Sequence, residues 1–201
     1  MRTFVVFRRG PAPILCVVCG LALTCSSFLD VLDGSGQAPK TGAWPRVHIE
    51  DAFTRGAVQW ALTGAARWLA SERCRGVLSE FRDTQGRPLT ERLETHGVDA
   101  QTYLTFLLFR DGSGTAQCAD DLTFAVTIPR GRVVFVCGRR FERVWRDSAK
   151  RAQAVVIHEM LHSLGLGENP PTSRAITERV LMLCDTTDKN PGRPIHLLKP
   201  R

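Results

Sequence analysis

Apolar residues recur at helical spacing in three long stretches of the chain, which predict helices over residues 50–73, 148–165 and 172–184. The first stretch carries aromatic and small apolar side chains on one face, which we expect to lie in the core: Phe53, Ala57, Trp60, Ala61 and Trp68. Ser148 is a suitable N-cap for the second helix, and Gly165 can end it because glycine readily adopts the left-handed conformation.

Shorter stretches rich in β-branched and aromatic residues predict three strands, over residues 104–109, 122–128 and 132–137. The turn residues Pro129-Arg130-Gly131 join the last two strands into a hairpin. A short helix is expected after Pro88. The order of elements predicts an α+β fold, in which a small antiparallel or mixed sheet packs with an N-terminal helix, a buried central helix and a C-terminal helix.

The N-terminus has the pattern of an export signal. Three arginines precede an apolar run over residues 14–23, which is too short to favour a membrane-spanning helix. The residues around Cys25 resemble a bacterial lipoprotein box with that cysteine as the acylated residue, and ordinary cleavage nearby is the alternative. We therefore expect residues 1–29 to be a signal, and the protein to reach the periplasm, the cell envelope or the extracellular space.

Composition and charge fit a single exported domain. Residues 30–46 are rich in glycine and proline, as linkers are, so residues 47–201 are predicted to form one domain. The net charge of the chain is +7, but without residues 1–25, which hold three arginines and no acid, 24 basic residues face 20 acidic ones and the charge is +4. The basic residues form no long block, so nucleic-acid binding is not indicated. Membrane contact is expected only through a lipid anchor at Cys25.

Four of the seven cysteines lie beyond the predicted signal: Cys74, Cys118, Cys137 and Cys184. An even number of cysteines in an exported chain predicts two disulfides, for which three pairings exist. We favour Cys137–Cys184, which would tie the strand before the second long helix to the segment after it. None of these four forms a C-x-x-C pair, so a cysteine metal site is not expected.

The strongest chemical signal is the sequence His158-Glu159-Met160-Leu161-His162 in the second helix. Residues four apart lie on one helix face, so both imidazoles can offer a nitrogen to a single Zn²⁺. Glu159 projects from the same side and can reach a water on that metal. The helix is apolar nearly all round, which predicts burial, and buried polar groups need partners. A metal ion would supply them.

The motif continues through Gly165 to Glu168 as H-E-x-x-H-x-x-G-x-x-E. Over residues 150–168 the chain resembles the zincin metallopeptidases, and the extended motif resembles their metzincin branch. The resemblance implies a minimal zincin-like lobe, in which the glycine turns the chain so that the residue six past the second histidine becomes the third ligand. Metzincins carry His or Asp at that position; Glu168 departs from the pattern but also offers an acceptable zinc donor.

Glu178 is a second candidate for the third ligand, because that ligand lies on a later helix in the thermolysin-like branch of the zincins. However, Glu178 lies roughly 200° around the helix from Ile176, which belongs to the apolar stripe. It also follows Arg174 by four residues, the usual spacing of an exposed ion pair. We therefore favour Glu168, with Asp185 as a further candidate.

These observations predict an exported zinc-dependent metallopeptidase that acts on a peptide or protein. Zn²⁺ would be held by His158, His162 and Glu168 and would activate a water molecule. Glu159 would act as the general base and pass the proton to the leaving amine.

The alternative is a non-catalytic exported domain that keeps zinc as a structural brace or binds a partner. A fourth protein ligand, such as Cys184 or Asp185, would favour this alternative because structural zinc sites are closed. If the protein is a peptidase, an extended substrate could pair with an edge strand, and residues 132–137 are our candidate for it. Cleavage specificity and oligomeric state stay open.

Overall fold

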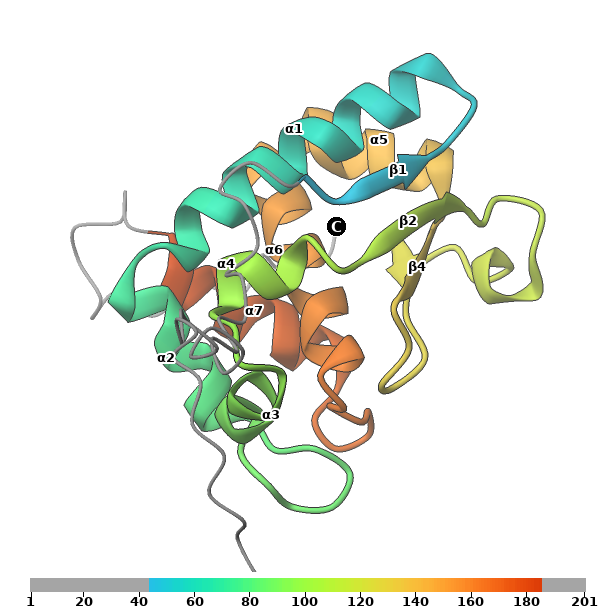
Figure 1. The fold of residues 1–201 in the computed structure, drawn as a ribbon. Coiled ribbons are helices and arrows are strands. Elements are labelled where there is room, and N and C mark those ends of the chain that lie inside the picture. Colours follow the sequence, from blue (N-terminus) through green and yellow to red (C-terminus); the bar gives the residue numbers. More distant parts are fainter. Residues whose placement is uncertain (1–43, 186–201) are drawn as a thin grey trace, which may run out of the picture. The chain divides into compact units, whose positions relative to one another are not determined.

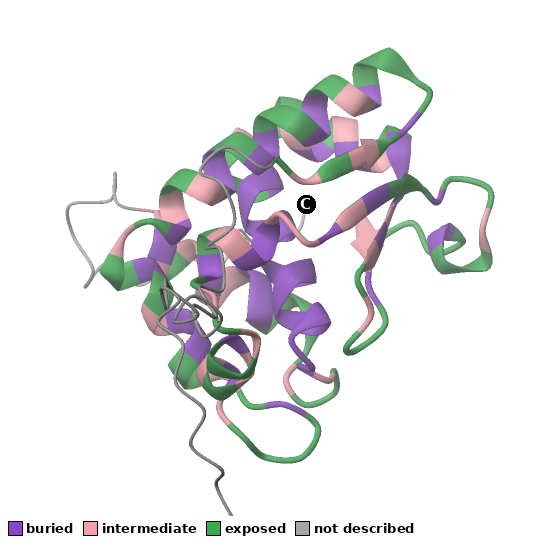
Figure 2. Ribbon diagram, viewed as in Figure 1, coloured by how far each residue is buried: buried purple, intermediate pink, exposed green. Residues whose placement is uncertain are grey.

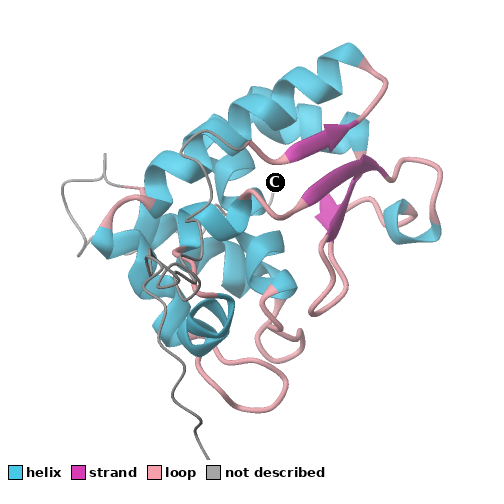
Figure 3. Cartoon of the chain, viewed as in Figure 1, coloured by secondary structure: helices cyan, strands magenta, loops and turns pink. Residues whose placement is uncertain are grey.

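A computed structural model describes residues 44–185 of the chain. The predicted signal with Cys25, most of the linker and the C-terminal tail lie outside the described residues. The elements follow in this order (Figures 1 and 3): β1 Arg46–His48, α1 Ala52–Leu69, α2 Glu72–Glu80, α3 Leu89–His96, α4 Ala100–Leu104, β2 Leu108–Asp111, the 3-10 helix η1 Ala116–Cys118, β3 Ala125–Val126, β4 Val133–Val136, α5 Gly138–Asp147, α6 Ala149–Ser163 and α7 Ser173–Cys184.

The four strands form one mixed sheet in the order β1-β2-β4-β3. β2 pairs in parallel with both β1 and β4, whereas β3 pairs antiparallel with β4. The mixed sheet and the hairpin were both predicted. The predicted edge strand over residues 132–137 was wrong, because β4 pairs on both sides and β3 lies at the edge.

Helix α6 is the central element of the helical layer. It packs against α1, α5 and α7, and every residue from Ala152 to Ser163 is buried (Figure 2). The Ser148 hydroxyl accepts a hydrogen bond from the backbone N–H of Arg151, which confirms the predicted N-cap. Gly165 adopts φ +113° just after the helix, a conformation that residues with a Cβ rarely take. The predicted boundaries of this helix are therefore confirmed by its capping groups.

The predicted helix over residues 50–73 corresponds to α1, but it ends earlier than predicted and a second helix, α2, begins within the predicted range. α1 ends at Leu69, and Ser71 caps α2 by accepting a hydrogen bond from the backbone N–H of Cys74. The helix α5 was not predicted at all, because its apolar positions are outnumbered by arginines and acids. The strand predicted to begin at residue 104 begins at Leu108, because Leu104 is the last residue of α4, which Asp99 caps, and residues 105–107 form the connection that follows.

The aromatic stripe of α1 was predicted to lie in the core, and this was wrong for two of its members. Phe53 and Trp60 are 50% and 41% exposed, and both contact the ring of Trp145 on α5. The core face of α1 instead carries small side chains, because α6 packs close against it. A Cβ on Gly64, for example, would come within 2.3 Å of the Gln153 side chain.

The two disulfides are Cys74–Cys184 and Cys118–Cys137. Their number was predicted, but the favoured pairing Cys137–Cys184 was wrong. Helices α2 and α7 pack against each other and bring Cys74 to Cys184. Cys118 is the last residue of η1, which follows β2, and Cys137 directly follows β4, the neighbour of β2 in the sheet. Two disulfides suit an oxidising compartment, such as the periplasm or the extracellular space. Among residues 44–185, no helix is long and apolar enough to cross a membrane.

Candidate metal centre

Three side chains predicted as ligands lie together at the C-terminal end of α6. His158 and His162 face each other with their Nε2 atoms 2.8 Å apart. Glu168, from the loop that follows the helix, places Oε1 at 3.5 Å and 3.3 Å from these two nitrogens. The three ligand atoms lie within 4.8 Å of one another, an arrangement that could hold a metal ion.

The outward-facing nitrogen of each imidazole has a hydrogen-bond partner that orients the ring. The backbone carbonyl of Leu166 accepts from Nδ1–H of His162 at 2.8 Å. Nδ1 of His158 lies 2.9 Å from the hydroxyl of Thr177 on α7. In the tautomer that carries its proton on Nδ1, the His162 imidazole presents an Nε2 lone pair to the centre, as a metal ligand must. Second partners of this kind are typical of histidines that bind metals.

The donor set fits a divalent cation in distance and in charge. Donors bound tetrahedrally at 2.0–2.1 Å lie about 3.3 Å apart. The two distances from Glu168 to the imidazole nitrogens, 3.5 Å and 3.3 Å, are close to this value, and the two nitrogens are somewhat closer to each other, at 2.8 Å. Burial lowers the pKa of His158, which favours the neutral imidazole that a metal requires. The hydrogen bond with His158 lowers the pKa of Glu168, which favours its carboxylate. Two imidazole nitrogens and one carboxylate oxygen therefore converge on one point.

Glu159 lies beside the donors without being one of them. It is buried, and burial raises the pKa of its carboxyl to about 8, an effect that the adjacent Thr127 partly opposes. Its Oε2 has no hydrogen-bond partner within the described part of the protein, and neither does the Thr127 hydroxyl. A buried polar atom without a partner is costly, which makes this carboxyl well suited to bind a reactant in the cleft.

The other candidate ligands are engaged elsewhere. Glu178 accepts a hydrogen bond at 2.7 Å from Nε of Arg174, the exposed ion pair that the spacing indicated. Asp185 pairs with Lys150 at 2.7 Å, and Cys184 is in a disulfide. Within residues 44–185, the group that could hold a metal ion contains no fourth His, Cys, Asp or Glu.

The loop that carries Glu168 is braced by Asp83, a residue whose role was not foreseen. The buried Asp83 carboxylate accepts hydrogen bonds from the backbone N–H groups of Gln85 and Arg87 and pairs with the Arg87 guanidinium at 2.8 Å. The backbone of Asp83 also pairs with that of Leu166 in an isolated antiparallel β-bridge, and the neighbouring Thr84 N–H donates a hydrogen bond to the carbonyl of Gly165. The turn after α6 is thus held against a second loop.

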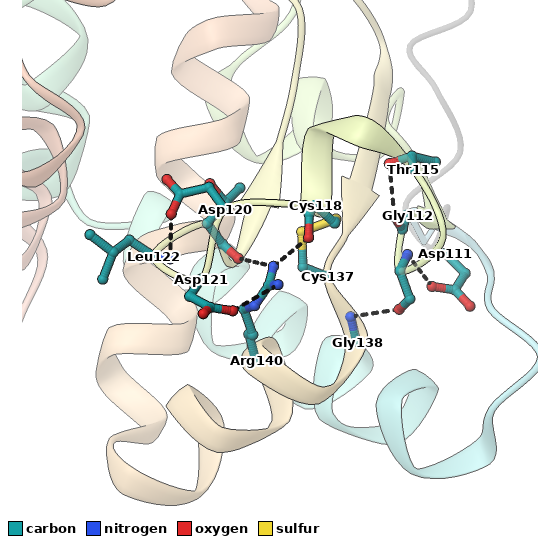
Figure 4. The surroundings of a disulfide bond; sticks show 12 residues. Asp111, Gly112, Thr115, Cys118, Asp120, Asp121, Leu122, Cys137, Gly138 and Arg140 are labelled. Carbon is teal, nitrogen blue, oxygen red and sulfur yellow. Dashed lines mark hydrogen bonds and ion pairs between the residues drawn. A yellow bond between two sulfur atoms is a disulfide. The ribbon is translucent and has the colours of Figure 1, made fainter.

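The centre opens into a cleft of about 670 Å³, with α6 and α7 on one side and residues 120–127 on the other. The second side includes the edge strand β3. Figure 4 shows how its start is anchored: the Cys118–Cys137 disulfide ties it to the end of β4, and Arg140 donates to the Cys118 carbonyl and pairs with Asp121 at 3.2 Å. The cleft therefore has one helical wall and one extended wall.

Sequence reasoning identified the residues that converge, but it missed those that orient them. Thr177, Leu166, Thr127 and Asp83 were not among the predicted site residues. Thr177 is distant in sequence and has no motif of its own, and Leu166 contributes a backbone carbonyl, which any residue could provide. Tyr103, the only tyrosine of the sequence, is buried, and its hydroxyl donates a hydrogen bond to the backbone carbonyl of Ser163. This hydroxyl is therefore already engaged within the core.

Comparisons of the chain with protein-family models, with curated proteins and with solved structures find no match.

Proposed function

We propose that this protein is an exported, zinc-dependent metallopeptidase of the zincin type, with His158, His162 and Glu168 as metal ligands and Glu159 as the general base. The observation that carries the proposal is the three-donor group beside a buried carboxyl in an open cleft. Three protein ligands with an open position are the pattern of catalytic zinc sites, and two histidines with a glutamate are one of its common forms.

The chain supplies the parts of a hydrolytic mechanism around the metal position. When bound, a zinc ion supplies Lewis-acid chemistry, polarising the scissile carbonyl and lowering the pKa of water. Thr177 and the Leu166 carbonyl hold the two imidazoles in orientation. Glu159 takes a proton from the water that attacks the carbonyl carbon and delivers it to the leaving amine.

The state of Glu159 suits this exchange. Burial raises the pKa of its carboxyl to about 8, within the range where a group both accepts and returns a proton near neutral pH. A divalent cation next to it would favour the carboxylate, because opposite charge stabilises the ionised form. The free edge of β3 offers backbone N–H and C=O groups on the same cleft, to which an extended peptide could add as a further strand.

The structural-zinc alternative requires a closed site. Its candidate fourth ligands were Cys184 and Asp185, but Cys184 forms a disulfide with Cys74, and Asp185 forms an ion pair with Lys150. This arrangement supports a catalytic zinc site over a structural one.

The test uses the oxidised full chain and measures both zinc content and peptide cleavage. We expect about one zinc per chain, cleavage of members of a mixed peptide library, and a loss of about 10²- to 10⁴-fold in cleavage for Glu159→Gln with zinc binding retained. Glu178→Gln is the matched control, since it removes an acid of the same kind outside the donor group. Zinc binding with no cleavage by the wild type would favour the non-catalytic domain, and equal cleavage by Glu159→Gln would remove that residue from the mechanism.

A further inference from the structure

The cleft continues beyond the metal centre along one face of α6. Arg151, Val155, His158 and His162 all line it. Their spacing of four, three and four residues places them on a single helical stripe. Arg151 lies seven residues before His158, which corresponds to about 10 Å along the helix axis. The stripe that begins with a cation therefore ends with the two candidate metal ligands.

Arg151 differs from the other exposed charged groups of the cleft in having no hydrogen-bond or ion-pair partner for its side chain among the described residues. Arg174 is paired with Glu178 at 2.7 Å, and Glu168 lies against the histidines. Asp120 accepts a hydrogen bond from the backbone N–H of Leu122 at 3.0 Å. For the exposed guanidinium of Arg151, no hydrogen bond or ion pair exists within residues 44–185.

The opposite wall sets the distance at which a peptide would meet this charge. A strand rises about 3.3 Å per residue, so a peptide extended along β3 covers about 10 Å in three residues. Val155 lies between Arg151 and His158 on the helix, and the cleft is also lined by the apolar side chains of Phe124 and Val126. A peptide that runs along α6 with its scissile bond at the metal centre would thus bring a side chain about three residues away to Arg151.

We propose that the cleft selects peptides with a carboxylate about three residues from the bond that is cut, and that Arg151 binds this carboxylate. The proposal rests on the peptidase function proposed above. A guanidinium binds a carboxylate through two parallel N–H donors, a geometry that a glutamine or asparagine side chain of the peptide cannot match. The carboxylate can belong to an Asp or Glu side chain or to the C-terminus of the peptide, and the test distinguishes these two sources.

The test measures cleavage of paired peptides by the zinc-loaded full chain. In each pair, Glu or Gln occupies a position two to four residues from the cut on either side, and the C-terminus is amidated; a second set ends in a free carboxylate at the same distances. Two carboxylate sources are compared, the Glu side chain and the free C-terminus. For at least one of them, we expect the wild type to cleave the carboxylate peptide with a kcat/KM at least about 10-fold higher than the matching neutral peptide, consistent with one charge-assisted contact. In Arg151→Gln this ratio should fall to about one, and in Arg151→Glu it should reverse in favour of the neutral peptide.

Two control variants test the assignment to Arg151. Arg143→Gln removes an exposed arginine of α5 outside the cleft, and should keep both the rate and the ratio. Arg174→Gln removes the paired arginine of the cleft, and should keep the ratio. A wild type without preference, a preference that survives in Arg151→Gln, or one that is lost in Arg174→Gln instead, would overturn the proposal.

Binding measurements separate this proposal from the peptidase function. The same peptides, fluorescently labelled, are titrated against Glu159→Gln alone and in combination with Arg151→Gln. If no variant cleaves any peptide, the peptidase proposal fails, and the anisotropy titration still reports whether the carboxylate peptide binds about 10-fold tighter through Arg151. Equal affinities for the carboxylate and neutral peptides would contradict the role of Arg151 whether or not cleavage occurs.

Discussion

The two walls of the cleft are held in place by different means. The helical wall carries the metal donors on α6, where twelve consecutive residues are buried, and each imidazole is oriented by a hydrogen bond. Of the extended wall, residues 120–127, only Thr127 is buried, and its strand β3 is two residues long. Burial fixes the first wall, whereas a disulfide and the contacts of Arg140 anchor the second.

This difference separates metal binding from substrate binding. The donors all come from the helical wall and from the loop that follows it, so their geometry depends on the core. The extended wall has few buried contacts, and such segments open locally at a lower free energy than the core. Changes in the helical wall should therefore affect metal affinity, and changes in the extended wall should affect peptide cleavage at constant metal affinity.

Replacement of both Cys74 and Cys184 by Ser should have the largest effect on stability. This disulfide joins residues 110 apart, and closing so long a loop in the unfolded chain is worth about 5 kcal/mol in the chain-entropy account. Since α7 carries the Thr177 partner of His158, zinc affinity should fall as well. Urea unfolding and zinc titration of the oxidised proteins measure both effects. A variant as stable as the wild type would show that the helical wall does not need this link.

Replacement of both Cys118 and Cys137 by Ser should lower stability less than the Cys74/Cys184 replacement does. Its main effect should be on peptide cleavage. Their sequence separation is 19, for which the same account gives about 3 kcal/mol. The extended wall would lose its anchor, so kcat/KM should fall, whereas zinc affinity should stay within about twofold because none of the donors lies on this wall. Parallel zinc titration and peptide cleavage check this. A loss of zinc affinity equal to that of the Cys74/Cys184 variant would remove the distinction between the walls.

Asp83→Asn should destabilise the protein by about 2 kcal/mol at neutral pH through the brace on the helical wall. Burial alone would raise the pKa of Asp83, but the hydrogen bonds from Arg87 and Gln85 outweigh it and hold the pKa at about 2, below its ordinary value of 3.8. The unfolded chain thus takes up the proton first. The stabilisation is complete above about pH 4 and is lost as the pH falls towards 2.

Urea unfolding between pH 2 and pH 7 checks this prediction. The wild type should lose more stability across the acid window than Asp83→Asn, which lacks the titrating group. Asp121→Asn is the control, because Asp121 is 97% exposed in its side chain and its pair with Arg140 should contribute little. Parallel acid profiles for the wild type and Asp83→Asn would contradict the assignment.

Thr177→Val should weaken zinc binding by about 10-fold with the smallest change in fold stability. Valine has a similar shape but cannot bond Nδ1 of His158, so the ring loses its orienting partner. Thr177→Ser keeps the hydroxyl and should keep the affinity. Competition with a chelator of known affinity measures the effect. Equal zinc affinity in the valine and serine variants would show that the core alone orients His158.

The features that could be predicted from sequence are those set by local periodicity. The α6 helix, its Ser148 cap and its end at Gly165 follow from residues within one turn of each boundary. The pairing of His158 with His162 needs only helical spacing. By contrast, the periodicity of α1 suggested that its aromatic residues are core, and this failed for Phe53 and Trp60 because close helix packing favours small residues.

By itself, the sequence determined that two imidazoles and a carboxyl lie on one buried helical turn, because the geometry of a helix is the same in any fold. Only the tertiary structure decided which cysteines pair, which strand forms the edge, and which side chains orient the histidines. These features join residues far apart in the chain, such as Thr177 with His158 or Asp83 with Leu166. Their contacts depend on how whole elements pack, and local spacing carries no information about that.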